Sequence, residues 1–437
     1  MNYNNRKIYS WNPVYNLLME IKDSIYREYG IPFFKKWKNK SLEDCLILLN
    51  NNYYNSLFSN LDITQKDSLI LLKYKGYQYI FNEEVNNDNF WNMYNGIYNE
   101  CRSVVIDLKS EEIVIAAQRK FSNLNERDGY MLKDIQEKIN NSKKVEISNK
   151  LDGSNQNFSY NTNGFIIGAG SQALDINNSW RLQDGFSMLD YRYRAMLQDW
   201  SDYTFLFEFI SQRDAHVVRY TKEQEGLYLF GMRNKKNGEE KTYQEVISIG
   251  NQYGVKTTEV FNDTLEGIMS KVNDYSSDEK EGWVIAIQDK DDNIFKVKLK
   301  VNDYVYMHKI LSKLTSPNLV VEAISNDKFD DFISKVPVAH REKVNKYSQI
   351  IYHYLDQMEE NVQGYYCIAP KDDKKGFMLW VDATVPKKYQ AYVRSLYLKK
   401  QYNFLKKGTL VTPSYKKFNE ILKEEGISVE EISEEDE

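Results

Sequence analysis

A lysine followed by a turn sequence is the part of this chain with the clearest capacity for covalent chemistry. Lys150 precedes Leu151, and Asp152, Gly153 and Ser154 come directly after. A lysine amine is almost entirely protonated at neutral pH, but desolvation or neighbouring cations lower its pKa and make it nucleophilic. It could then attack an electrophile such as the α-phosphorus of a nucleoside triphosphate. Alone, the pattern is short and degenerate, and it also fits a surface hairpin turn.

The residues before this lysine indicate the element that positions it. Residues 145–148 alternate apolar and polar side chains, which is typical of a strand with one buried face. The pair Asp152-Gly153 is a turn signal. Lys150 is therefore predicted to lie where a strand ends and a hairpin begins.

Distant segments carry further charged residues of the kinds that a nucleotidyl-transfer site needs. Arg102 opens a predicted strand, and a guanidinium there could hold a phosphate. Lys120 follows another cation, Arg119, and precedes an aromatic and polar run. Glu208 interrupts an apolar strand at 204–210, where a buried carboxylate is costly unless it binds something. Ordinary alternatives are a surface ion pair for Arg102 and a salt bridge from Glu208 to a buried lysine.

Two predicted strands further along the chain add an acid and a pair of lysines. Glu281 opens one strand, which is a suitable place for a contact to Mg²⁺. Lys296 and Lys298 lie on the same side of the next strand, because side chains alternate along a strand with period two. Two cations directed at one point would stabilise a transferring phosphoryl group. The alternative is that both lysines belong to the solvated face of the strand.

The order of these motifs resembles that of a known protein family. The motifs are Glu100-Cys101-Arg102, Lys120-Phe121-x-Asn123-Leu124-Asn125-Glu126, Lys150-x-Asp152-Gly153-Ser154, Phe207-Glu208-Phe209, Glu281-Gly282 and Lys296-x-Lys298. Together they resemble the lysine-dependent nucleotidyltransferases. Within that superfamily the resemblance is to the RNA ligase 1 family, which includes the tRNA-repairing ligase of T-even bacteriophages. It spans roughly residues 70–310 and continues more weakly into the C-terminal part.

The resemblance implies catalytic roles for four residues. Lys150 would be the nucleophile that becomes covalently bound to AMP. Glu281 would serve the metal-dependent step as the metal-binding residue. Lys296 and Lys298 would bind the α-phosphate of the nucleotide.

The resemblance also implies further residues that bind the nucleotide. Arg102 and Lys120 would hold the triphosphate. The pair Asp152-Gly153 would shape the pocket, and Glu208 would contact the ribose. Tyr304 matches an aromatic residue that follows the last motif in the family, although two extra residues intervene here.

Two segments depart from the family pattern. Ala169 stands where the family tends to have a lysine before its Gly-Ser pair. Residues 211–215 differ from the family's usual Asn-Arg pair. One cationic contact is therefore missing or supplied by another residue.

The activity implied by the resemblance is ATP-dependent RNA ligation. Such an enzyme joins 5′-phosphate and 3′-hydroxyl RNA ends through a lysyl-AMP intermediate and an RNA-adenylate. The implied cofactors are ATP and Mg²⁺, with Mn²⁺ as an alternative metal. The implied partners are RNA with such ends, tRNA among them, and a separate end-healing kinase or phosphatase that acts in RNA repair, with no membrane partner.

Other classes of protein share this chemistry or this fold. An mRNA-capping guanylyltransferase or a DNA ligase uses the same lysine motif, but both usually append a β-barrel, whereas this chain continues with helical patterns. An RNA-binding pseudoenzyme is the alternative outside enzymes. It would be expected to lose the reactive lysine or the acids, and all of them are present.

The sequence predicts an α+β fold with antiparallel sheets, because hairpins are interleaved with helices. Residues 1–310 are predicted to form the nucleotidyltransferase domain, with a helical N-terminal segment. Residues 311–437 are predicted to form an all-helical C-terminal domain that determines RNA specificity and ends in an acidic tail. Helices are expected from Pro13 to Gly30, after capping boxes at Ser41 and Thr242, and at 344–358 and 387–400.

Basic and aromatic residues are interleaved between residues 387 and 407. Such a surface could grip phosphates and stack bases. The alternative is a packed amphipathic helix whose tyrosines face the core and whose lysines are solvated.

The composition predicts a soluble protein of the cytoplasm, which would be a host cytoplasm if a phage encodes the chain. A hydrophobic fraction of 42% with 28% charged residues excludes disordered and fibrous classes. The three cysteines are far apart, which argues against a disulfide framework and a zinc knuckle. We find no signal-peptide pattern and no run near the ~20 apolar residues of a membrane helix.

Overall fold

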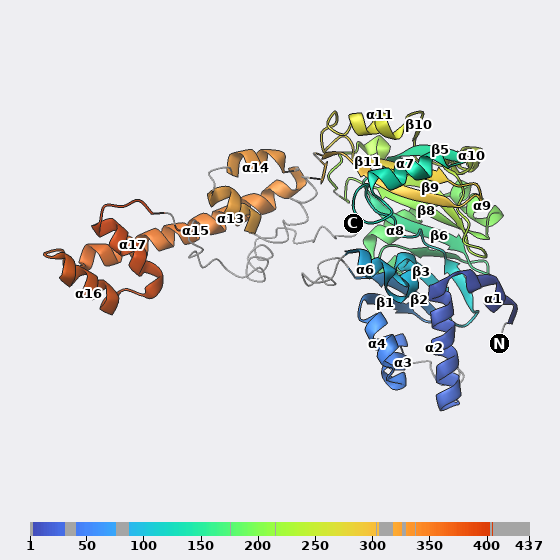
Figure 1. Cartoon of the computed structure of the whole chain (residues 1–437), viewed down its shortest axis with the longest axis horizontal. Helices are drawn as coiled ribbons and strands as arrows, with labels where there is room; N and C mark the ends of the chain where they lie inside the picture. Colours follow the sequence, from blue (N-terminus) through green and yellow to red (C-terminus); the bar gives the residue numbers. More distant parts are fainter. Residues whose placement is uncertain are drawn as a thin grey trace. The chain divides into compact units, whose positions relative to one another are not determined.

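The protein is described by a computed structural model in which two compact units are distinguished. The described residues are 3–30, 41–75, 87–174, 176–214, 216–302, 304–305, 318–325, 329–336, 338–402 and 404. The first unit ends at Val305, and the second contains the helices from Asn318 onward. In its described residues the first unit contains three antiparallel four-stranded sheets with helices packed on them, so the predicted α+β fold is confirmed (Figure 1).

The first sheet is covered by the helices of the N-terminal segment. Its strands pair in chain order: β1 (Leu61–Lys66), β2 (Leu69–Tyr74), β3 (Arg102–Asp107) and β4 (Glu112–Ile115). The helices are α1 (Tyr3–Ile8), α2 (Pro13–Tyr29), α3 (Leu42–Leu49), α4 (Asn52–Phe58) and α6 (Asn87–Asn92). Helices α2 to α4 share one hydrophobic core with β2 and β3. This packing fixes Arg102 at the start of β3.

Local sequence signals explain where several helices begin and end. The side chain of Asn12 accepts hydrogen bonds from the first turn of α2, and the helix ends at Gly30, whose φ is 59°. The predicted capping boxes at Ser41 and Thr242 are both formed, at the starts of α3 and of α10 (Tyr243–Tyr253). The β-rich run at 77–80 also predicts a strand, and it lies outside the described residues.

Two further sheets carry the strands on either side of Lys150. The second sheet has the order β10 (Val260–Phe261), β5 (Lys144–Lys150), β11 (Gly282–Gln288) and β12 (Ile294–Lys300). The third has the order β7 (Ile166–Ala169), β6 (Ser154–Tyr160), β8 (Tyr203–Ile210) and β9 (Gly226–Asn234). The sequence also predicts hairpins across Asn163-Gly164 and across residues 291–293, and both are confirmed, as β6–β7 and β11–β12.

Residues 151–153 connect these two sheets, which corrects the prediction of a hairpin at this point. β5 pairs with β10 and β11, whereas β6 pairs with β7 and β8, so these two described strands do not pair with each other. Gly153 permits a close approach: a Cβ atom there would lie 2.5 Å from the backbone oxygen of Phe209 in β8. The turn signal therefore marks a crossing between sheets, and Lys150 lies where they meet.

Five helices flank the second and third sheets. They are α7 (Leu132–Asn140), α8 (Trp180–Ser187), α9 (Tyr191–Asp199), α10 and α11 (Leu265–Ser270). Residues of α8, α9 and α10 form one core with the apolar residues of β8 and β9. That core fixes the three helices on the third sheet.

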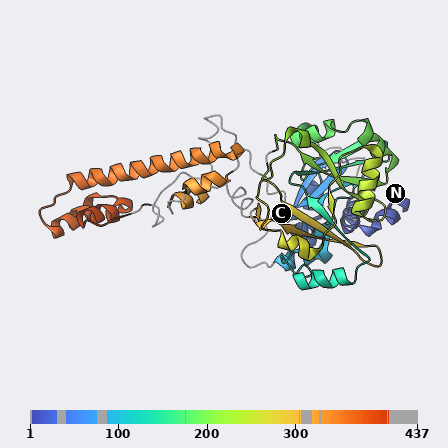
Figure 2. The same ribbon diagram turned by 90° about the horizontal axis from the view of Figure 1, so that it is seen from above.

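The second unit is helical in its described part. Its helices are α13 (Asn318–Ser325), α14 (Phe329–Lys335), α15 (Val338–Ile368), α16 (Lys374–Thr384) and α17 (Lys387–Tyr397). The predicted helix at 344–358 is confirmed as part of α15, which is one long helix (Figure 2). None of the described helices combines the length and the apolar composition that crossing a membrane requires. The acidic residues 424–437 lie outside the described part.

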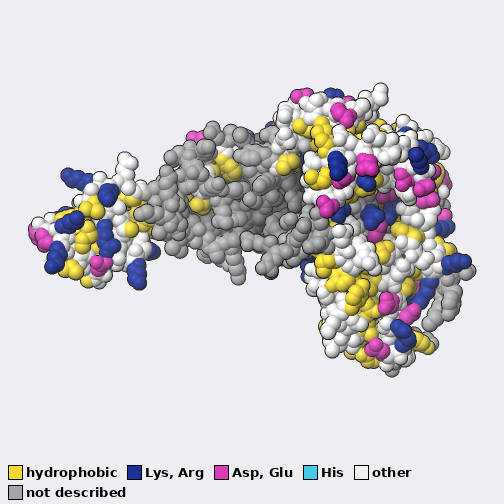
Figure 3. Space-filling model, viewed as in Figure 1, with side chains coloured by type: hydrophobic (Ala, Val, Ile, Leu, Met, Phe, Trp, Pro, Cys, Tyr) yellow, Lys and Arg dark blue, Asp and Glu magenta, His cyan; other side chains and the backbone are white. Residues whose placement is uncertain are grey.

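In the second unit, two tyrosines of α17 lie in the core, and lysines lie on the surface. Tyr389 and Tyr392 are buried in a core with Phe377, as the packing alternative predicts. Lysines and arginines gather on the surface of α16 and α17 (Figure 3). The exposed lysines of this region are Lys371, Lys374, Lys375, Lys387, Lys388, Lys399 and Lys400.

Candidate active site

Lys150 forms an ion pair at the end of β5. The register of the second sheet sets Lys150 opposite Gly282, so Glu281 lies beside it. The distance from Lys150 Nζ to Glu281 Oε2 is 2.6 Å, and Lys300 Nζ lies 3.4 Å from the other carboxylate oxygen. Burial alone would raise the pKa of Glu281, but Lys150 and Lys300 outweigh it and hold this pKa below its usual value.

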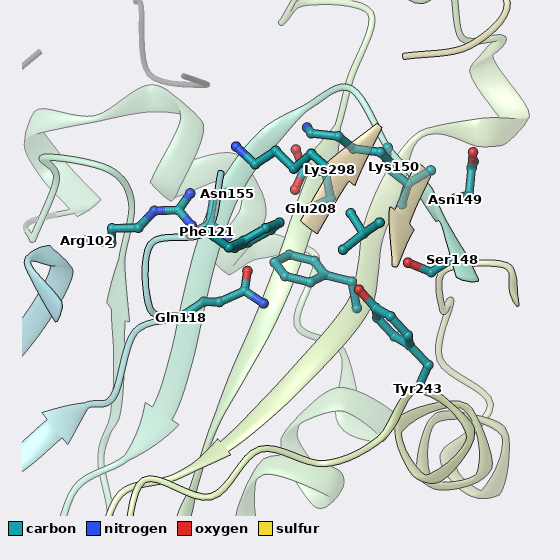
Figure 4. Close-up of a pocket in the computed structure, with 13 residues that line it drawn as sticks. Arg102, Gln118, Phe121, Ser148, Asn149, Lys150, Asn155, Glu208, Tyr243 and Lys298 are labelled. Carbon is teal, nitrogen blue, oxygen red and sulfur yellow. The ribbon is translucent and has the colours of Figure 1, made fainter. Parts of the chain in front are cut away.

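A cavity opens beside Lys150, between the second and third sheets. Arg102, Lys150 and Lys298 enter it from three different strands (Figure 4). Its apolar lining residues are Phe121, Leu151, Phe230 and Val284. Its other lining residues are Gln118, Ser148, Asn149, Asn155, Glu208 and Tyr243. An apolar slot beside several cations suits a nucleotide, because the base needs apolar contacts and the phosphates need positive charge.

Lys298 is a buried cation surrounded by other cations. It is 4% exposed. Burial, together with Lys120, Lys150, Arg102 and Lys300, holds its pKa well below the usual value for lysine. An anionic ligand would relieve this repulsion, so the electrostatics of the cavity favour a polyphosphate.

The side chain of Arg102 also favours an anionic ligand. Its Nη1 atom is buried and has no hydrogen-bond partner among the described residues. A buried donor without a partner is costly, and a phosphate oxygen would satisfy it. The guanidinium lies over the ring of Phe121 at 5.8 Å, and Lys298 Nζ lies 5.0 Å from the centre of the same ring.

Lys120 and Lys296 line a different pocket. This neighbouring basic pocket also includes Arg119, Arg127 and Lys138. Lys120 Nζ lies 5.0 Å from the centre of the Trp91 ring. Lys296 forms a short ion pair with Glu240. The structure therefore places Lys296 on the predicted face of β12 but does not bring it into the cavity with Lys150 and Lys298.

Asp152 and Tyr304 support the loop after Lys150 instead of lining the cavity. Asp152 is buried, and its two carboxylate oxygens accept hydrogen bonds from the Tyr304 hydroxyl and from the backbone N–H of Val218, both at 2.8 Å. The backbone N–H of Gly153 donates to Glu208 at 3.1 Å. These contacts hold the loop in one conformation and set the orientation of Lys150.

Two residues near Lys150, namely Lys300 and His216, lie outside the motifs on which the sequence prediction rests. Lys300 continues the alternation of Lys296 and Lys298 by one more step, so period-two spacing could have found it. His216 Nδ1 lies 3.6 Å from Asp152 Oδ1, a contact that only the fold creates, and its Nε2 lies 3.2 Å from Oδ2 of Asp214, two residues earlier in the chain.

The described residues contain no group of three or more His, Cys, Asp or Glu side chains that could hold a metal ion. Mg²⁺ usually keeps several waters and binds through one or two carboxylates plus substrate phosphates. Glu208 is the carboxylate of the cavity lining, and Glu281 lies at its edge beside Lys150. The residues present therefore fit a metal that arrives with the nucleotide.

Comparison with known proteins gives one family. Residues 100–304 match the family model described as RNA ligase, and this segment contains every site residue predicted above. No curated protein matches the chain.

Two kinds of solved structure are similar to the chain. A Naegleria gruberi RNA ligase mutant with ATP and Mn is 19% identical with a TM-score of 0.35, over 44% of this chain and 58% of that one. An archaeal ATP-dependent RNA ligase is 13% identical with a TM-score of 0.44, over 89% of this chain and 99% of that one. The match to the Naegleria protein thus covers less than two thirds of its length.

Proposed function

We propose, from the premise that residues 100–304 belong to the RNA ligase family, that this protein is an ATP-dependent RNA ligase with Lys150 as its nucleophile. The observation that carries the proposal is the cation-lined cavity at the end of β5. Lys150, Lys298 and Arg102 line it together, and the Arg102 Nη1 donor is buried and unsatisfied among the described residues. A polyphosphate beside a lysine is the arrangement that nucleotidyl transfer needs.

In the first step, Lys150 Nζ would attack the α-phosphorus of ATP. An N–P bond forms, the bond to the β-phosphate oxygen breaks, and pyrophosphate leaves with that electron pair. The amine must lose its proton before it attacks, and the Glu281 carboxylate 2.6 Å away holds the amine in place. Lys298 and Arg102 would stabilise the charge that develops on the phosphate oxygens.

Two further transfers would complete the reaction. A 5′-phosphate oxygen of RNA would attack the phosphorus of the lysyl-AMP, so that the N–P bond breaks and Lys150 is released. A 3′-hydroxyl would then attack the 5′-phosphorus of this RNA-adenylate, and AMP would leave. Bound Mg²⁺ or Mn²⁺ would neutralise phosphate charge in these steps, with Glu281 or Glu208 as the protein contact.

The roles of the remaining site residues are part of the proposal. We infer that Glu208 contacts the ribose and that Lys120, in the neighbouring basic pocket, holds the triphosphate. The resemblance assigns Lys296 to the α-phosphate, but its ion pair with Glu240 in the same neighbouring pocket favours a supporting role. The buried contacts of Asp152 and Tyr304 support a positioning role, because they fix the loop that carries Lys150.

The finer substrate assignment rests on the second unit. The exposed lysines of α16, α17 and the adjoining segments form a basic surface that suits RNA phosphates. We propose that residues 311–437 select the RNA, with tRNA among the candidates. A separate end-healing kinase or phosphatase would prepare the RNA ends. The protein would repair RNA in the cytoplasm, which would be that of an infected cell if a phage encodes the chain.

Covalent labelling with α-labelled ATP tests the first step. Wild type should retain label after denaturation, and Lys150→Ala should retain none. Lys143→Ala is the matched control, because Lys143 lies in the same segment but pairs with Asp292 on the surface. Persistent labelling of Lys150→Ala would contradict the assignment, and labelling by GTP or sealing of nicked DNA alone would point to another nucleotidyltransferase.

A further inference from the structure

A second pocket lies beside the nucleotide cavity and has a different chemical character. It is formed by β1, the start of β6, the loop after β7 and the start of α8. Amides and hydroxyls make up most of its polar lining, among them those of Asn155, Gln172 and Asn178. Its charged lining residues are Lys66 and Arg181, and none of the lining residues that the structure describes is acidic.

A path of shared residues joins this pocket to Lys150. Asn155 lines the nucleotide cavity, the second pocket and a small recess between them. The recess also contains Lys73 and Arg102. Ser154, which follows the lysine motif, lines both the recess and the second pocket. A group bound in the second pocket would therefore lie next to a phosphate held at Arg102, as the acceptor of that phosphate must.

Buried contacts hold one wall of the second pocket in place. The Asp214 side chain is 2% exposed and accepts a hydrogen bond from Arg181 Nε at 2.7 Å. The same carboxylate accepts a hydrogen bond from the Ser154 hydroxyl at 2.5 Å. Gln156 Nε2 donates to the backbone oxygen of Arg181 at 2.7 Å. The wall is thus preorganised, and it is linked through Ser154 to the loop after Lys150.

The lining chemistry indicates the ligand. We propose, resting on the RNA ligase function above, that this pocket binds the 3′-terminal nucleoside of the RNA strand that supplies the 3′-hydroxyl. A terminal ribose carries free 2′- and 3′-hydroxyls, which both donate and accept hydrogen bonds, as amide and hydroxyl side chains do. The 5′-phosphate end carries more negative charge, and it is matched better by Arg102 and Lys73 in the recess.

The three chemical steps can be measured separately to test this assignment. Asn178→Leu and Lys66→Met each change one lining residue of the pocket and leave the nucleotide cavity intact. We expect lysyl-AMP formation and adenylate transfer to a 5′-phosphorylated RNA to be unchanged. For joining a pre-adenylated RNA to a 3′-hydroxyl RNA, the KM for the hydroxyl strand should rise about tenfold. The matched controls Asn163→Leu and Lys109→Met change exposed residues elsewhere and should alter no step.

Binding measurements give a readout that is independent of turnover. Fluorescence anisotropy would compare short RNAs that end in a ribose with the same RNAs ending in a 2′,3′-dideoxyribose. Wild type should bind the ribose end about fivefold more tightly, and Asn178→Leu should lose that preference.

Two results would overturn the assignment. A defect confined to adenylate transfer would assign the pocket to the 5′-phosphate end, and a joining KM and ribose preference that are unchanged in both variants would remove the pocket from RNA binding. Failure of wild type to form lysyl-AMP would instead contradict the proposed function, and the binding comparison would still decide the pocket.

Discussion

Lys298 and Lys296 lie two positions apart on one face of β12, about 7 Å along the strand, yet their surroundings differ in charge. Lys298 is surrounded mainly by cations, and burial and those cations lower its pKa. Burial also acts against ionisation of Lys296, but Glu240 outweighs it and raises this pKa. A buried cation that forms no ion pair among the described residues is available to an anionic ligand, whereas one that is already paired, as Lys296 is with Glu240, contributes to the fold.

This difference separates two regions of the same strand. The cavity beside Lys150 contains the Nη1 atom of Arg102, which has no hydrogen-bond partner among the described residues, and the crowded amine of Lys298. Both would gain from a bound phosphate. In the neighbouring basic pocket, Glu240 already compensates Lys296. We infer that the first region binds the reacting phosphate and that the second is partly a structural ion-pair network.

Within this comparison, the largest effect is expected from removing Lys298. Lys298→Met should lower the rate of lysyl-AMP formation by about 10²–10³-fold, because a charge directed at the transferring phosphate is lost. Rapid-quench labelling with α-labelled ATP measures this rate. The melting temperature should not fall, since the substitution removes repulsion within a buried cluster of cations.

Lys296→Met is the comparison for this variant. It changes the same side chain two residues away, and its labelling rate should fall less. A larger loss in Lys296→Met than in Lys298→Met would contradict the distinction between the two regions.

Glu240→Gln should convert the paired lysine into an uncompensated one. Breaking one side of a buried ion pair costs about 3 kcal/mol, and we expect the free energy of unfolding to fall by that order at pH 7. Denaturant unfolding followed by tryptophan fluorescence measures it. The double variant Glu240→Gln/Lys296→Met should recover most of the loss, because it leaves no buried charge at the pair.

The stabilisation by the Glu240–Lys296 ion pair should decrease as the pH falls. Burial opposes ionisation of Glu240, but Lys296 and Arg233 outweigh it and lower its pKa in the folded state. The stabilisation is therefore present above the unfolded value of about 4.3 and disappears as the pH falls through the lowered folded value. The raised pKa of Lys296 keeps the pair intact up to at least about pH 10. A difference between wild type and variant that grows on acidification would contradict this origin.

The sequence predicts which strands carry the site residues better than it predicts which strands pair and which side chains meet. Arg102, Glu208 and Lys298 lie on the strands expected for them, because strand signals are local. The partners of the two lysines come from distant segments, so period-two spacing could place Lys296 and Lys298 on one face without distinguishing them. The crossing at 151–153 was missed for the same reason, since a turn signal does not reveal which strands pair.

In the C-terminal unit, too, the sequence pattern alone does not determine which residues are buried. Interleaved lysines and tyrosines at 387–400 fitted both an RNA surface and a packed helix. The structure buries Tyr389 and Tyr392 and leaves Lys387 and Lys388 exposed. Helical periodicity decides which residues share a face, but the packing partners that cover one face come from α15 and α16.

The smallest expected effect tests the aromatic ring beside Arg102 and Lys298. Phe121 lies under both Lys298 and Arg102, at 5.0 Å and 5.8 Å from the ring centre. Phe121→Leu keeps an apolar side chain but removes the ring, and a cation–π contact of this kind is worth about 1 kcal/mol. The KM for ATP in lysyl-AMP formation should therefore rise about threefold to fivefold. Phe295→Leu changes an aromatic residue of the neighbouring basic pocket, under Lys138, and should leave this KM unchanged. Equal changes in the two variants would mean that the ring acts through general packing, and the distinction between the two regions would then rest on charge alone.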